Sequence, residues 1–129
     1  MRYAVLILAL TLSGCLKDET VSGYAPAGAT FVLQSIDDTA FSATATITFP
    51  EEGRIAGQAP CNNYSGAQTV PYPWFKAENI ASTKRACPDL AAEQTYFAAL
   101  SAMSLSEVSS TTLILSNEAG RKMLFTAQN

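Results

Sequence analysis

The chain has 129 residues, of which 48% are hydrophobic and 15% are charged, with a formal net charge of −3 and no histidine. This length fits one ordinary domain, and the acidic balance argues against a nucleic-acid binder. Without histidine, the chain has no Ser-His-Asp triad, no Cys-His dyad and no HExxH zinc site. Three cysteines are an odd number for so short a chain and require an explanation.

Residues 1–14 have the features of a secretory signal peptide. The positive charge of Arg2 precedes an apolar run over residues 4–12, which is too short to span a bilayer as a helix. The run ends in Leu12-Ser13-Gly14-Cys15, which resembles the lipobox of bacterial lipoproteins. This resemblance implies cleavage before Cys15, acylation of its thiol and new amine, and stable anchoring in a lipid bilayer.

The residues after the lipobox suggest where the protein is located and where its domain begins. Leu16 stands where aspartate would be a retention signal, which in Gram-negative lipoproteins favours the outer membrane, facing the periplasm. Residues 15–29 are mostly small, polar or turn-forming, so we expect a lipidated flexible tether. The folded domain is then expected over residues 30–129, which suffice for a modest core.

Strand patterns dominate the first half of the domain. Residues 30–36 are rich in β-forming side chains and predict a first strand. Residues 43–49 place threonines on one face and apolar side chains on the other, which is typical of a half-buried antiparallel strand. A turn at 50–53 lets residues 54–58 return as the hairpin partner.

The middle of the chain has weaker signals. The stretch 58–66 is expected to be a loop. Residues 67–70 and 74–77 are interpreted as a further hairpin around Pro71 and Pro73.

One helix is predicted between residues 88 and 103. Pro88-Asp89 suits a helix start, and the following residues are rich in Ala, Leu, Glu and Gln without glycine. The apolar stripe expected to face the core consists of Leu90, Phe97, Leu100 and Met103. Glu93 and Gln94 are assigned to the opposite side.

The C-terminal part returns to strands at 105–108, 111–115 and 121–125, joined by connectors that suit hairpins. Strands, one helix and further strands, without regular βαβ alternation, predict an α+β fold that is mostly β, with an antiparallel sheet.

Residues 53–66, Gly-Arg-Ile-Ala-Gly-Gln-Ala-Pro-Cys-Asn-Asn-Tyr-Ser-Gly, resemble the core motif of the META domain. This is the HslJ-like family of small bacterial envelope proteins, many of them lipoproteins. Residues 80–88 resemble the second cysteine segment of the family, and Glu93, Phe97 and Leu100 match its helix pattern. The resemblance implies a curled antiparallel sheet or partial barrel with one helix packed on it. The functions associated with the family are phenotypes, such as heat-shock induction and antibiotic resistance, and not reactions.

Cys61 and Cys87 lie at the two cysteine positions of these motifs, and they remain in an oxidising envelope once Cys15 is lipidated. A disulfide is the first interpretation, a pair of buried thiols the second, and a redox pair or metal site the third. The chain has no C-x-x-C motif, no histidine and no evident further zinc ligands, so we expect no metal and no cofactor.

Five polar residues form a candidate binding surface: Asn62, Asn63, Tyr64, Lys84 and Arg85. The asparagines suit either a turn-stabilising role or the binding of a glycan or peptide. The two basic residues, beside Cys87, suit either a solvated turn or a contact to anionic lipid or polysaccharide.

These features predict a non-enzymatic, membrane-tethered lipoprotein with a binding or stress-protection role. The expected partners are the lipid bilayer, through acylated Cys15, and an envelope protein or glycan, but no nucleic acid. One alternative is an inhibitor of a host hydrolase such as lysozyme, and another is an envelope hydrolase with paired carboxylates. Two converging carboxylates would favour the hydrolase, a protruding rigid loop the inhibitor, and a shallow polar surface the binding module.

Overall fold

The computed structural model describes residues 17–128. The predicted signal peptide, the lipobox with Cys15, and Leu16 lie outside the described residues. The elements within the described range are η1 (Val21–Gly23), β1 (Thr30–Ile36), β2 (Thr39–Ala40), β3 (Thr46–Thr48), β4 (Arg54–Gln58), β5 (Asn63–Ala67), β6 (Glu78–Ser82), α1 (Leu90–Ala102), β7 (Leu105–Val108), β8 (Thr112–Ser116) and β9 (Lys122–Ala127).

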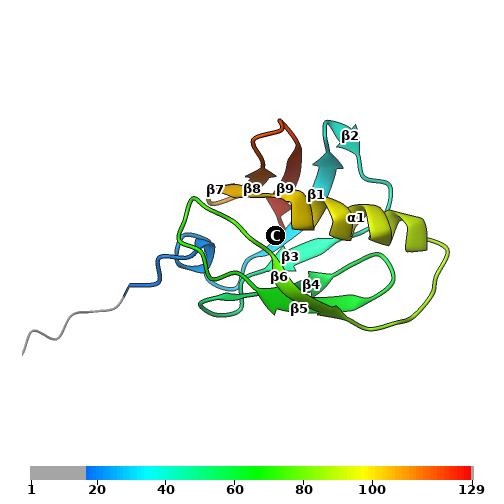
Figure 1. Ribbon diagram of the computed structural model, residues 1–129, viewed down its shortest axis with the longest axis horizontal. Coiled ribbons are helices and arrows are strands. Elements are labelled where there is room, and N and C mark those ends of the chain that lie inside the picture. The colour runs from blue at the N-terminus through cyan, green and yellow to red at the C-terminus, as the bar shows by residue number, and fades with distance from the viewer. Residues whose placement is uncertain (1–16, 129) are drawn as a thin grey trace, which may run out of the picture.

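All strands belong to one antiparallel sheet with the order β6-β5-β4-β3-β1-β9-β8-β7, while the short β2 pairs with the end of β1. The sheet curls into a half-barrel, and α1 lies across it (Figure 1). The central strand β1 pairs Phe31 with Ile47 of β3 on one side and with Ala127 of β9 on the other. The predicted α+β fold with a curled antiparallel sheet and one packed helix is confirmed.

The segment between β5 and β6 is not the predicted hairpin at 67–70 and 74–77. It instead lies along the outer edge of β7, where the Ser106 amide donates to Pro73 at 2.7 Å and the Phe75 amide to Ser104 at 2.9 Å. The prediction was wrong because prolines lack an amide hydrogen and interrupt a regular ladder. The segment links the two edge strands of the sheet, β7 and β6.

Three strands of the sheet were not predicted, and one of them is the two-residue β2. Residues 58–66, expected to be a loop, include most of β5, and β6 was missed altogether. β5 and β6 are short and poor in the β-branched and aromatic residues that signal a strand. Close backbone approach explains part of this composition, since a Cβ on Gly66 would lie 2.9 Å from the Glu78 carbonyl oxygen.

The core lies between the concave face of the sheet and α1. Fully buried side chains from both layers meet there: Phe31, Ile47, Ile55, Tyr96, Leu100, Leu113, Leu115, Met123 and Phe125. The predicted helix stripe needs two corrections, because Leu90 is 38% exposed and Glu93 is only 5% exposed. The Glu93 side of the helix faces inward, where the carboxylate accepts hydrogen bonds from Cys61 and Asn62.

The predicted flexible tether over residues 15–29 is wrong for the part after Glu19. Val21 is 1% exposed and belongs to the core, and the Tyr72 amide donates to the Glu19 carbonyl at 2.7 Å. Tyr24 stacks on Tyr72 with ring centroids 4.2 Å apart. Apolar burial and aromatic stacking therefore fix this segment against the domain. Among the described residues, no helix is both long and apolar enough to cross a membrane.

Candidate functional site

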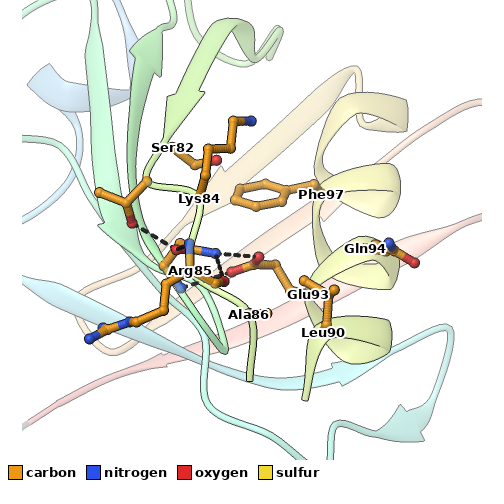
Figure 2. Close-up of a pocket in the computed structure, with 10 residues that line it drawn as sticks. Ser82, Lys84, Arg85, Ala86, Leu90, Glu93, Gln94 and Phe97 are labelled. Atoms are coloured by element: carbon orange, nitrogen blue, oxygen red, sulfur yellow. Dashed lines mark hydrogen bonds between the residues drawn. The ribbon is translucent and has the colours of Figure 1, made fainter. Parts of the chain in front are cut away.

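The side chain of Asn62 is the centre of a buried polar network at the start of β5 (Figure 2). Its amide nitrogen donates to the Arg85 carbonyl at 2.9 Å and to Glu93 Oε2 at 2.8 Å. Its amide oxygen accepts from the Arg85 amide at 2.6 Å and from the Thr83 hydroxyl at 2.8 Å. The network thus uses both donors and two acceptor positions of the side chain, as a buried amide requires.

Glu93, in the first turn of α1, is the acidic member of this network. Its Oε1 atom accepts the amides of Cys61 at 3.1 Å and of Asn62 at 2.9 Å. Within residues 17–128, the ion pairs of the structure involve other carboxylates. Hydrogen bonds from N–H groups therefore compensate the buried carboxylate, together with the positive end of the α1 dipole.

A disulfide between Cys61 and Cys87 lies beside the network, with the two Cα atoms 5.6 Å apart. This confirms the first of the three interpretations of the cysteine pair. The bond joins the loop before β5 to the segment before α1. Together, the disulfide and the side chain of Asn62 hold the backbone of residues 83–87 at fixed points. The described part of the chain contains no group of ligands suited to a metal ion.

Tyr64 lies on the inner side of β5 and not on the surface. Its hydroxyl donates to the Thr46 carbonyl at 2.7 Å and lies 2.6 Å from the Tyr96 hydroxyl. Burial raises the pKa of the Tyr64 phenol well above its ordinary value, and it does the same for Tyr96. Both phenols are therefore neutral, and they tie α1 to the sheet.

A hollow of about 280 Å³ lies next to the network, between β6 and α1. We call it the β6–α1 groove. Residues 82–86 line one side, and Leu90, Gln94 and Phe97 of α1 line the other. Figure 2 shows the Phe97 ring extending from the helix toward Lys84, with the Glu93 carboxylate below them.

The structure divides the five candidate surface residues. Lys84 and Arg85 are exposed on one wall of the groove, and Asn62 is buried beneath them. In Figure 2 the guanidinium group of Arg85 extends away from α1. Asn63 lines a separate shallow depression on β5 and β6, and Tyr64 next to it is buried with 4% of its surface exposed. For Asn62, the side-chain hydrogen bonds go to Thr83, Arg85 and Glu93, which lie 21 to 31 positions away, so the side chain joins distant segments and does not stabilise its own turn.

Sequence reasoning missed the helix side of the groove. Phe97 and Leu90 were assigned to the core stripe, and Glu93 to the outer side of the helix, although these residues line the groove. One signal was available, because Glu93 and Phe97 match the family helix pattern in the resemblance and lie one helical turn apart.

The fold and the site define a small α+β domain, stapled by one disulfide, with a curled sheet and a single helix. The sequence profile of the META domain matches residues 25–129, and the chain therefore belongs to the META domain family. Comparison with curated proteins finds no match.

Three solved structures share the fold. An NMR structure of a protein from Burkholderia xenovorans has a TM-score of 0.63 at 20% identity, over 88% of this chain and 85% of that one. A second NMR structure has a TM-score of 0.56 at 20% identity, over 74% and 86% of the two chains. The crystal structure of a DUF4847 family protein from Bacteroides vulgatus ATCC 8482 has a TM-score of 0.51 at 20% identity, covering 66% of this chain and 59% of that chain. At this identity the likeness concerns the fold alone.

Proposed function

We propose that this protein is a cell-envelope lipoprotein, anchored through acylated Cys15 in the outer membrane and facing the periplasm. Its META domain acts there as a non-enzymatic binding module, and the β6–α1 groove is its ligand site. The stress-protection role considered from the sequence is then a consequence of binding.

One observation carries the proposal: the groove combines a rigid frame with uncommitted surface groups. The disulfide and the Asn62 side chain hold residues 83–87, so the groove needs little ordering when a ligand binds. The exposed Lys84 forms no ion pair within residues 17–128, and Phe97 offers a half-buried aromatic wall. A shallow site with one apolar and one cationic wall suits recognition.

The same geometry gives little support to the hydrolase alternative. Paired-carboxylate hydrolysis needs two carboxyl groups that face one substrate. Among the described residues, the groove contains one carboxyl group, Glu93, and both of its oxygens accept hydrogen bonds from the protein. The family is also not known to be enzymatic.

The anchoring part of the proposal is tested by Cys15→Ala. We expect the variant to be released into the soluble fraction, while the unchanged protein stays with the membranes. Membrane association of Cys15→Ala through the same detergent fractionation would contradict the lipobox interpretation.

The binding part is tested by crosslinking in living cells, with a photoreactive residue at position 84. A matched control places it at Glu118, an exposed residue of the β8–β9 turn beyond the opposite end of α1. We expect discrete adducts from position 84 that position 118 does not give. Identical adduct patterns from both positions would contradict the proposal that the groove is the ligand site.

A further inference from the structure

The backbone of β6 exposes hydrogen-bonding groups on its outer edge. β6 is the last strand of the sheet and pairs only with β5. The Thr83 amide donates to the Asn63 carbonyl at 3.1 Å, and Ala81 pairs with Ser65. Because successive residues of a strand direct their backbone groups to opposite edges, the N–H and C=O groups of Ile80 and Ser82 point away from β5.

One residue of that edge, Ser82, borders the β6–α1 groove. Ser82 stands opposite Tyr64, one position from the hydrogen-bonded pair of Thr83 and Asn63, so the ladder alternation directs the Ser82 amide and carbonyl away from β5. An edge of this kind is a template for pairing with another strand. Natural edge strands are often covered by a helix or loop, but here the space beside Ser82 is the β6–α1 groove.

The groove lies between α1 on one side and, on the other, the end of β6 at Ser82 with the segment 83–86 that follows it. α1 forms its far wall with Phe97 and Leu90, which are apolar, and Gln94, which is polar. Lys84 stands beside the strand edge on the near wall. Strand edges bounded by a helix recognise extended peptides through main-chain hydrogen bonds, and wall pockets select alternate side chains.

We propose that the β6–α1 groove binds an extended peptide segment, which adds to β6 as a further antiparallel or parallel strand. This inference rests on the proposed function and names the chemistry of its ligand. The peptide pairs with the outward backbone groups of Ser82, the residue of β6 that lines the groove. Side chains on one face of the added strand contact Phe97, and an acidic side chain or terminal carboxylate pairs with Lys84.

The shape of β6 favours a short peptide over edge-to-edge pairing of two copies of this chain. The β5–β6 ladder has an irregularity between Ser65 and Ala67, and Asn79 has a positive φ of 52°. Both features interrupt the regular edge on the N-terminal side, so only the end of β6 near Ser82 is straight enough to pair. A few residues of an extended partner segment fill that length.

The test is selection from a display library of random linear peptides against the purified lipoprotein in detergent. We expect enrichment of peptides that combine an aromatic or aliphatic residue with an acidic one. Methylation of single backbone nitrogens in a selected peptide should weaken binding by about tenfold at alternate positions and much less between them, since only every second N–H faces β6.

On the protein, Ser82→Pro removes the outward amide and should weaken the selected peptides by about tenfold, whereas the matched Ser82→Ala keeps the amide and should weaken them much less. If Ser82→Pro does not fold, the methylation series alone tests strand addition, through the alternation of its effects along the peptide. No enriched peptide, or enriched peptides whose binding shows no alternation, would overturn strand addition. Binding of soluble peptidoglycan fragments in place of peptides would also overturn it, while leaving the groove and the anchored binding module intact.

Discussion

Two acidic side chains in this molecule organise polar networks in opposite environments. Glu93 is 5% exposed and accepts hydrogen bonds from Cys61 and Asn62. Asp37 is exposed at the tip of the β1–β2 hairpin, where it accepts from the Lys122 amide at 3.0 Å and from the Arg121 guanidinium at 3.0 Å. The buried carboxylate has no ion pair among residues 17–128, and the exposed one has a cation.

This contrast shows that the number of hydrogen bonds a carboxylate accepts does not by itself measure its contribution to stability. Around Asp37, water replaces any bond that is lost, so the network adjusts cheaply. Around Glu93, water is largely absent, and each lost acceptor leaves a buried donor unpaired. The loop that forms one wall of the β6–α1 groove therefore depends on Glu93 far more than the hairpin depends on Asp37.

The largest effect is expected for Glu93→Ala. The substitution leaves the amides of Cys61 and Asn62 without acceptors and opens a cavity beside them, so we expect a loss of roughly 4 kcal/mol in the free energy of unfolding. Urea denaturation followed by circular dichroism measures it.

Two further variants sharpen the Glu93 result. Glu93→Gln keeps an acceptor but turns an NH₂ group toward the Asn62 side chain, so its loss should be intermediate. The control is Gln94→Ala, the exposed neighbour on α1, which should stay within about 0.5 kcal/mol of the unchanged protein. A loss for Glu93→Ala no larger than that of the control would show that the network does not support the loop.

A second large effect is expected for the double substitution Cys61→Ser and Cys87→Ser. The disulfide closes a segment with a sequence separation of 26, and the chain-entropy estimate for a loop of this length is about 3.5 kcal/mol. Thermal unfolding with and without reductant measures it. Reductant should lower the Tm of the unchanged protein and leave that of the double variant unaltered. A Tm of the unchanged protein that ignores full reduction would contradict a stabilising bond.

The elements with a strong sequence pattern were predicted, and the strands that form mainly because they pair with neighbouring strands were missed. β1, β4, β7, β8, β9 and α1 are marked by alternation, turns or helical spacing. β5 and β6 have small and polar residues, so their strand character comes from neighbours and not from their own composition. The same limit applies to the site: Asn62 and Glu93 are each visible as motif residues, but their contact spans 31 positions and depends on the curl of the sheet.

The smallest effect is expected at Asp37, and its dependence on pH distinguishes the two networks. The Lys122 amide and the Arg121 side chain lower the pKa of the Asp37 carboxyl below its ordinary value. A lowered pKa in the folded state means that the stabilisation is complete above the unfolded pKa of about 3.9 and disappears as the pH falls through the folded pKa. Asn tolerates the positive φ of 51° at position 37, and its side-chain oxygen can still accept from the Lys122 amide. Because Asp37→Asn removes only the charge, the variant should be slightly less stable than the unchanged protein at neutral pH. Urea titrations between neutral and strongly acidic pH should show this small difference closing below the ordinary aspartate pKa. A stability difference between Asp37→Asn and the unchanged protein that stays constant into strong acid would mean that the charge of Asp37 does not contribute to stability.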